Sequence, residues 1–185
     1  MSSKNFLRSK FLKLRKKNYF SLRQEFFNPL NILIKKINKK NKQVIMGIFY
    51  PSNFEVNILK IFDNNISKKL KISLPKIKKN YQMEFYAWKK NEVLEVNEYG
   101  IPEPVSEKKK CFPEVILIPL IAYDKYKNRL GYGKGFYDRY LDGGLNKRRK
   151  ILTIGVAFSF QKYKKIPVTK MDVKLDYILT EKGLF

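Results

Sequence analysis

The feature that most constrains the fold is a buried-strand pattern followed closely by a glycine-rich stretch. The apolar run VILIPLIAYD covers residues 115–124 and is the strongest strand candidate in the chain. It precedes RLGYGKGFYDRYL, residues 129–141, in which Gly131, Gly133 and Gly135 occupy alternate positions. A strand that is apolar on both faces is typical of a parallel sheet, and open parallel sheets bind ligands beyond the carboxyl ends of their strands. The sequence therefore predicts an α/β domain with a ligand site at the glycines.

Two helices are predicted before this stretch. The first spans Lys4 to Asn18, because apolar residues recur there at helical spacing and basic residues occupy the other face. Asn28-Pro29 interrupts the next segment, and residues 30–37 resume a helical pattern. Proline is tolerated at a helix start and not in its interior, so we expect a helix, a break and a second helix.

A βα unit is predicted next. Residues 43–51 form a continuous apolar run of strand length, as a strand covered on both faces requires. In residues 53–66, Val56, Leu59 and Phe62 fall on one face of a helix.

The remaining strands complete the α/β pattern. Residues 83–88 and 92–96 are predicted to be two strands joined by a polar turn, whereas residues 99–106 contain two prolines and a glycine and are expected to form a loop without a regular ladder. Further strands are expected over residues 69–75, 151–158 and 175–181. Strands that alternate with helices indicate a layered α/β fold, here a three-layer αβα Rossmann-like fold with a mainly parallel sheet.

Length and composition fit one domain spanning residues 1–185. A chain of 185 residues with 44% hydrophobic residues can bury a full core without disulfides or metals. The lone Cys111 cannot form an internal disulfide, and the first twenty residues carry charges every few positions and no apolar signal segment. No uncharged apolar run approaches the length needed to cross a bilayer. We therefore expect a cytoplasmic monomer without a membrane segment.

The formal net charge of +24 raises the question of a polyanionic partner. Lysines are spread through many segments and no nucleic-acid recognition motif is present, so we expect no specific nucleic-acid partner. The abundance of Lys, Asn, Ile, Phe and Tyr, which all have AT-rich codons, offers a compositional origin for the charge. A basic RNA-binding protein on a nucleotide-binding fold stays open as an alternative, because aromatics alternate with lysines in KIKKNYQMEFYAWKK. A small polyanionic ligand fits the charge equally well.

The glycine stretch has the chemistry of a phosphate site. Closely spaced glycines let backbone N–H groups point inward, and the helix predicted from Phe136 begins where an anion is favoured. Lys134 and Arg129 offer charge for a polyphosphate, and Asp138 offers the hard oxygen that Mg²⁺ accepts. The pattern is not a Walker A motif, which needs Ser or Thr after the lysine. A plain tight turn, with Asp138 as a solvated acid in the first turn of the helix and Lys134 on the surface, explains one glycine better than three.

A longer segment carries a family resemblance. AYDKYKNRLGYGKGFYDRYL resembles the signature of 5-formyltetrahydrofolate cyclo-ligases, also called 5,10-methenyltetrahydrofolate synthetases, which has the pattern D-x-x-G/N-x-R-L-G-x-G-x-G-[FY]-Y-D after a buried strand. Four other segments resemble the family in matching order along nearly the whole chain: KNFLRSKFLKLR, FYPSNFEVN, GIPEP and IGVAFSFQ with the C-terminal IPVTKMDVKLDYILTE.

The resemblance implies a reaction. Members of the family use ATP and Mg²⁺ to close 5-formyltetrahydrofolate to 5,10-methenyltetrahydrofolate with release of ADP and phosphate. The formyl oxygen is phosphorylated, N10 attacks the activated carbon and phosphate leaves. Lys134 and Arg129 would be the catalytic cations, and since the chain has no histidine, no imidazole base takes part. The fold implied is the CoA-transferase-like form of the Rossmann-like domain.

The resemblance also assigns ligand contacts by position. ATP would be bound by Lys4, Arg8, Arg129, Leu130, Gly131, Tyr132, Gly133, Lys134, Gly135, Phe136 and Tyr137. The folate substrate would contact Tyr50, Glu55, Tyr132, Gly133, Lys134, Gly135 and Phe136. The Mg²⁺ ligands would be Asp138 and Asp172.

Each assignment has a plainer alternative. Lys4 and Arg8 also fit the solvated face of an amphipathic helix, and Glu55 fits the first turn of a helix. Tyr50 could be a core or rim aromatic, and Asp172 a loop carboxylate. The chain departs from the family at residue 171, where Met stands in place of a frequent His, and at the pair Phe136-Tyr137, where Tyr-Tyr is frequent.

Overall fold

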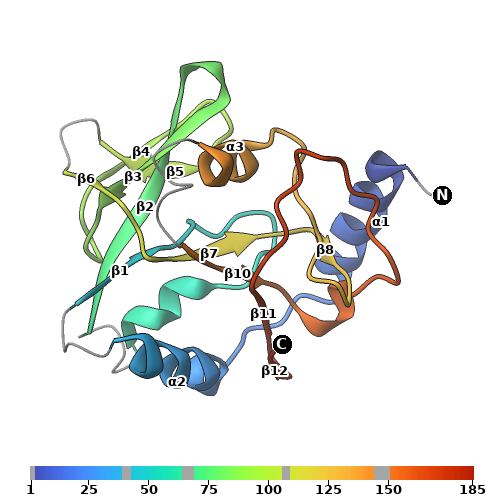
Figure 1. Ribbon diagram of the computed structural model, residues 1–185, viewed down its shortest axis with the longest axis horizontal. Helices are drawn as coiled ribbons and strands as arrows, with labels where there is room; N and C mark the ends of the chain where they lie inside the picture. The colour runs from blue at the N-terminus through green and yellow to red at the C-terminus, as the bar shows by residue number, and fades with distance from the viewer. Residues whose placement is uncertain (1–2, 39–42, 64–68, 106–108, 144–150) are drawn as a thin grey trace.

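A large twisted sheet forms the centre of the molecule (Figure 1). The computed structural model describes residues 3–38, 43–63, 69–105, 109–143 and 151–185. In this part of the chain the sheet has eight strands in the order β12-β11-β10-β7-β1-β2-β3-β6. Their bounds are β1 Val44–Gly47, β2 Leu70–Lys78, β3 Gln82–Ala87, β6 Lys110–Cys111, β7 Val115–Pro119, β10 Leu152–Val156, β11 Tyr177–Thr180 and β12 Gly183–Leu184.

Parallel pairing dominates the middle of the sheet. Strands β11, β10, β7, β1 and β2 are parallel to one another, whereas β12 at one edge pairs antiparallel with β11, and at the other edge β3 pairs antiparallel with β2 and β6. The prediction of an α/β fold with a mainly parallel sheet is confirmed.

Helical segments cover both faces of this sheet. Alternate residues of β7 point to opposite sides, so that Val115 lies in one apolar cluster and Ile116 in another. The Val115 cluster contains buried residues of three helical segments, η1 (Gln24–Phe27), α2 (Asn28–Ile37) and η2 (Ile58–Asp63). On the other face, α3 (Phe136–Asp142) packs against the Ile116 cluster. This arrangement is the expected αβα layering.

Helix α1 (Lys4–Lys17) lies outside these layers, at the carboxyl end of β7 (Figure 1). It starts after Ser3, whose Oγ accepts a hydrogen bond from the N–H of Phe6 at 3.2 Å. The buried Leu7 and Phe11 pack in a third apolar cluster with residues of the hairpin formed by β8 (Ala122–Tyr123) and β9 (Arg129–Leu130). The hairpin leads directly into the glycine stretch, so α1 is packed beside it.

Two strand predictions were wrong. The strand expected over residues 115–124 ends at Pro119, where the missing N–H stops the ladder, and Ala122 then pairs with Leu130 in a separate two-stranded sheet. Residues 99–106 were expected to lack a ladder, but β5 (Pro102–Pro104) pairs antiparallel with β4 (Leu94–Val96). Both strands of this small sheet have an open edge, where proline is tolerated. The strand expected over residues 92–96 was predicted to follow residues 83–88 after a turn, but as β4 it pairs with β5 and not with β3.

The segment after β1 also differs from the prediction. Strand β1 ends at Gly47, and no α-helix follows it within the described residues 43–63. Asn53 and Phe54 have left-handed φ values of 47° and 61°, which a helix from residue 53 cannot accommodate, and the 3₁₀ segment η2 begins only at Ile58. Residues 64–66 of the expected helix lie outside the described residues. Among the described helices, none is long and apolar enough to span a membrane.

Candidate active site

A cavity of about 410 Å³ lies beyond the carboxyl ends of β1 and β7. This is where an open α/β sheet places its ligand site. Helix α1, the turn at residues 49–55, the glycine stretch, the start of α3, the β2–β3 pair and the β4–β5 sheet all contribute to its lining. Every predicted site residue is among those that line the cavity.

Two of the three glycines in the glycine stretch adopt a backbone conformation that favours glycine. Gly133 and Gly135 have φ values of 102° and 70°, which side-chain-bearing residues rarely adopt. A Cβ at Gly133 would also lie 3.1 Å from the guanidinium of Arg8. Gly131 does not need positive φ, and a Cβ there would meet nothing within 4 Å. The backbone therefore requires glycine at the second and third positions and not at the first.

Cationic side chains surround this stretch. Arg8 donates from Nε to the carbonyl of Gly131 at 2.9 Å, and Lys4 Nζ lies 2.6 Å from Asp172 Oδ2. Lys134 is exposed, with its Nζ 5.7 Å from the ring centroid of Tyr99 and 5.9 Å from that of Tyr81. Cations predicted from distant parts of the sequence are thus brought to one side of the cavity.

The two predicted metal ligands, Asp138 and Asp172, each accept hydrogen bonds at one carboxylate oxygen from a cationic side chain and a backbone N–H. Asp138 accepts hydrogen bonds at Oδ1 from Arg129 Nη1 and from the N–H of Val173, both at 3.0 Å. Asp172 accepts at Oδ2 from Lys4 and from the N–H and hydroxyl of Thr169. Among the described residues, no hydrogen bond reaches the second oxygen of either carboxylate. Each carboxylate therefore keeps one oxygen available.

The two carboxylates suit Mg²⁺, which keeps waters among its ligands, better than a metal that is enclosed entirely by protein ligands. No cluster of three or more His, Cys, Asp or Glu residues that could hold a metal occurs in the described ranges. Mg²⁺ is commonly held by one or two carboxylates together with waters and substrate phosphates. Burial acts to raise the pKa of Asp172, but the hydrogen bonds from Lys4 and Thr169 outweigh it and hold the pKa below its usual value. The carboxylate is therefore ionised at neutral pH.

Arg129 has little freedom in this arrangement. Only 7% of its surface is exposed, and its guanidinium forms an ion pair with Asp138. A phosphate contact by this residue would have to use the N–H groups that Asp138 leaves available.

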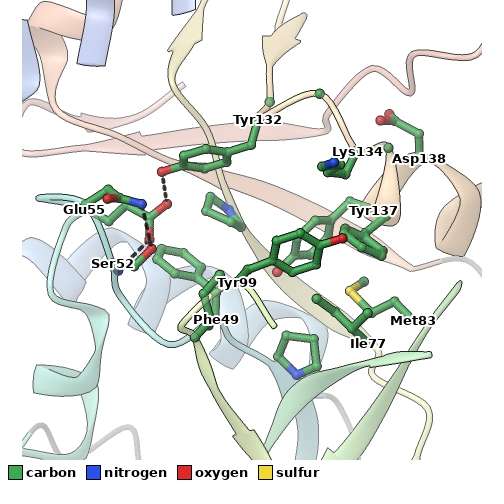
Figure 2. A pocket seen from close by; sticks show the side chains of 18 of the residues that line it. Phe49, Ser52, Glu55, Ile77, Met83, Tyr99, Tyr132, Lys134, Tyr137 and Asp138 are labelled. Carbon is green, nitrogen blue, oxygen red and sulfur yellow. Dashed lines mark hydrogen bonds between the residues drawn. The ribbon is translucent and has the colours of Figure 1, made fainter. Parts of the chain in front are cut away.

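On the opposite side of the cavity, a hydrogen-bonded network surrounds the buried carboxylate of Glu55 (Figure 2). Oε1 of Glu55 accepts from the hydroxyl of Tyr132 at 2.5 Å, and Oε2 accepts from the N–H of Ser52 at 2.9 Å. Burial raises the pKa of Glu55 above its usual value, and the bonds from Tyr132 and Ser52 and the charge of Arg15 oppose this rise. Burial and the neighbouring Glu55 also raise the pKa of Tyr132, so its hydroxyl is protonated at neutral pH.

Apolar side chains line much of the rest of the cavity wall. They were not predicted from the sequence and come from the turn after β1, the β2–β3 pair and the β4–β5 sheet: Phe49, Ile77, Met83, Tyr99, Ile101 and Pro102 (Figure 2). The GIPEP segment was the one signal that could have indicated part of this wall. Ser52 and Arg15 were also missed, although Arg15 follows Lys4 and Arg8 at helical spacing.

Comparisons with known proteins identify relatives over most of the chain. Residues 1–181 match the 5-formyltetrahydrofolate cyclo-ligase family. A protein of Schizosaccharomyces pombe named as a probable 5-formyltetrahydrofolate cyclo-ligase is 31% identical over 156 residues, which cover 77% of this chain and 76% of that protein.

Two solved structures are similar over almost the whole chain. The structure of Aquifex aeolicus 5,10-methenyltetrahydrofolate synthetase has a TM-score of 0.72 and 30% identity, covering 98% of this chain and 91% of the other. The structure of a 5,10-methenyltetrahydrofolate synthetase from Mycoplasma pneumoniae has a TM-score of 0.68 and 26% identity, covering 96% of this chain and 98% of the other.

Proposed function

The chain belongs to the 5-formyltetrahydrofolate cyclo-ligase family, and from this membership we propose that it uses ATP and Mg²⁺ to convert 5-formyltetrahydrofolate to 5,10-methenyltetrahydrofolate, releasing ADP and phosphate. One observation carries the proposal. A single cavity has the glycine stretch with its cations and carboxylates on one side and the buried Glu55 on the other, and apolar side chains line the rest of its wall. Figure 2 shows Glu55 and Asp138 on opposite sides of this cavity.

ATP would bind on the side of the glycine stretch. The contacts would come from Lys4, Arg8 and residues 129–137, because backbone N–H groups and cations together complement a triphosphate. The left-handed Gly133 and Gly135 bring the main chain close to the cavity without a Cβ between backbone and ligand.

Asp138 and Asp172 would hold Mg²⁺ through their available oxygens. The metal would neutralise charge on the phosphate oxygens. Arg129 and Lys4, which occupy the other oxygens, would keep both carboxylates in position.

The folate would bind on the side of Glu55. Both oxygens of this carboxylate already accept hydrogen bonds from the protein, and each has a further lone pair for the amino and ring N–H groups of a pterin. Tyr50 and the apolar wall would cover the faces of the ring.

The proposed reaction then proceeds in two steps. The formyl oxygen attacks the γ-phosphorus of ATP, an O–P bond forms, and the bond to the bridging oxygen of ADP breaks. N10 next attacks the formyl carbon and loses its proton, and the C–O bond breaks as phosphate leaves with its electron pair. Lys134 would neutralise the charge on the transferred phosphoryl group, since phosphoryl transfer depends mainly on positioning and charge neutralisation. The chain has no histidine, so the N10 proton is not taken by an imidazole.

The test is direct. The purified protein is mixed with ATP, Mg²⁺ and 5-formyltetrahydrofolate, and the near-ultraviolet absorbance of the methenyl product is followed, with ATP omitted as the control. We expect ATP-dependent absorbance. No absorbance, together with salt-sensitive RNA binding, would instead support the RNA-binding alternative.

A further inference from the structure

Arg15 is a buried cation that has no place in the reaction described above. Only 1% of its surface is exposed. Its guanidinium joins three segments of the cavity wall. Nε donates to the carbonyl of Asn53 at 2.9 Å, Nη1 donates to the carbonyl of Leu120 at 3.2 Å, and Nη2 donates to the hydroxyl oxygen of Tyr132 at 2.6 Å.

The bond from Arg15 to Tyr132 determines which atom donates in the hydrogen bond between Tyr132 and Glu55. A guanidinium can only donate, so the hydroxyl oxygen of Tyr132 must accept from Arg15. The single hydroxyl hydrogen of Tyr132 is then directed to Glu55 Oε1, 2.5 Å away. The N–H of Ser52 can also only donate, so Oε2 of Glu55 accepts as well. Both oxygens of Glu55 are thereby fixed as acceptors.

The same guanidinium supports an unusual turn. Asn53 and Phe54 are consecutive non-glycine residues with left-handed φ values of 47° and 61°, and they immediately precede Glu55. Such backbone persists only where its surroundings hold it. The bond from Arg15 Nε to Asn53 is the side-chain contact that holds this turn from α1.

We propose that Arg15 is a positioning residue that fixes Glu55 as an acceptor on both carboxylate oxygens, so that the site selects a ligand edge made of N–H donors. The identification of that ligand as a pterin rests on the proposed function. The orientation of Glu55 by Arg15 does not.

Helix α1 links this role to the nucleotide side. Lys4, Arg8 and Arg15 are separated by four and seven residues, so all three lie on one face of the helix. Lys4 bonds to the predicted metal ligand Asp172, Arg8 bonds to Gly131 of the glycine stretch, and Arg15 reaches the network around Glu55. One rigid element therefore sets the positions of groups on both sides of the cavity.

The electrostatic surroundings of Glu55 supply a readout. The groups that face it are Arg15 from α1, Tyr132 from the glycine stretch and Tyr137 from α3. The charge of Arg15 and the bond from Tyr132 both lower the pKa of Glu55 against the effect of burial. Weakening either contact should therefore raise this pKa further.

The experiment measures the pKa of the Glu55 carboxyl group by ¹³C NMR in the ligand-free protein, with Glu55→Gln assigning the signal. Arg15→Lys keeps the charge but cannot make the three bonds, and we expect it to raise the pKa of Glu55. Tyr132→Phe should raise this pKa too, and the double variant should raise it by less than the sum of the two, because Arg15 acts through Tyr132. The matched control is Lys16→Met, which removes an exposed charge next to Arg15.

Kinetics provide the second readout. Arg15→Lys should raise the KM for 5-formyltetrahydrofolate about tenfold and leave the KM for ATP within about threefold, because a lost bond in a charged network costs about one order of magnitude in affinity. An unchanged pKa of Glu55 in Arg15→Lys, or a strictly additive double variant, would overturn the proposal. A wild-type protein that forms no methenyl product would contradict the proposed function, whereas the titration of Glu55 would still decide the role of Arg15.

Discussion

The two sides of the cavity differ in how they hold most of their charged groups, although Arg129 beside the glycine stretch is as buried as Glu55. On the nucleotide side, Lys134 is exposed and Lys4 keeps 26% of its side chain exposed. On the other side, Arg15 and Glu55 are 1% and 7% exposed, and each has more than one hydrogen-bond partner in the protein. Exposed cations can follow a phosphate that is transferred and released, whereas a buried network presents one fixed pattern of acceptors. Under the proposed function, the side with Lys134 and Lys4 would accommodate changing charge, and the side with Glu55 would recognise the folate.

Removing the exposed lysine should have the largest effect on the nucleotide side. Lys134→Ala should lower kcat by about 10²- to 10³-fold while the fold stays intact, because this cation would act on charge that develops in the transition state. Steady-state kinetics and circular dichroism check the two parts of this expectation. Lys125→Ala is the matched control, since Lys125 is also exposed and lies 5.0 Å from a tyrosine ring centroid but does not line the cavity. Near-normal turnover of Lys134→Ala would remove this lysine from the phosphate site.

Glu55→Gln should break the recognition pattern on the other side. An amide places a donor where the network requires an acceptor, either against Tyr132 or against Ser52. We expect the KM for 5-formyltetrahydrofolate to rise by about 10²-fold, since a charged hydrogen bond contributes about 1.5–3 kcal/mol. The KM for ATP should change little. Equal losses for both substrates would show that the two sides do not act separately.

Asp138→Asn tests whether Asp138 is a Mg²⁺ ligand. Asparagine can still accept from Arg129 and Val173 at one oxygen, but it loses the negative charge that a cation needs. The Mg²⁺ concentration for half-maximal activity should rise about tenfold, a typical loss when a metal site is weakened. Asp63→Asn serves as the control, because Asp63 forms an exposed ion pair with Lys90 away from the cavity. An unchanged metal titration for Asp138→Asn would assign the ion to another carboxylate.

The smallest expected effect is a difference in stability between alanine substitutions at Gly133 and at Gly131. Gly133→Ala should lower the free energy of unfolding by about 1–2 kcal/mol, because alanine is disfavoured at left-handed φ. It should also weaken ATP binding, since the new Cβ would lie 3.1 Å from the guanidinium of Arg8. Gly131→Ala meets no such contact and should be close to wild type. Denaturant unfolding and the KM for ATP compare the two variants, and equal behaviour would contradict the role given to the backbone at Gly133.

Much of the fold could be predicted because local patterns carried it. The stripe of α1, the apolar runs of β7 and β10 and the parallel sheet follow from hydrophobic periodicity. The break after Pro119 was missed because the apolar pattern continues through residues 120–123, although the strand does not. The pairing of β4 with β5 was missed because prolines obscure a strand that has one open edge.

The candidate site divides in the same way. The nucleotide side lies largely on one continuous motif, so the sequence indicated most of its residues. The folate side is assembled from segments far apart in the chain, and its central bond joins Glu55 to Tyr132, which are 77 positions apart. Arg15 was missed because a cation at the end of a basic helix is normally solvated, and only the packing of α1 shows that this one is buried.

The most direct test of the two-sided cavity is a calorimetric titration of ATP alone and of 5-formyltetrahydrofolate alone into two variants, Arg8→Gln and Glu55→Gln. We predict that Arg8→Gln weakens ATP binding and leaves folate binding within about threefold, and that Glu55→Gln has the opposite pattern, because each side chain contacts one side of the cavity and distant sites act independently. If both variants weakened the same ligand, or if neither changed any affinity, the division of the cavity into a nucleotide side and a folate side would be wrong.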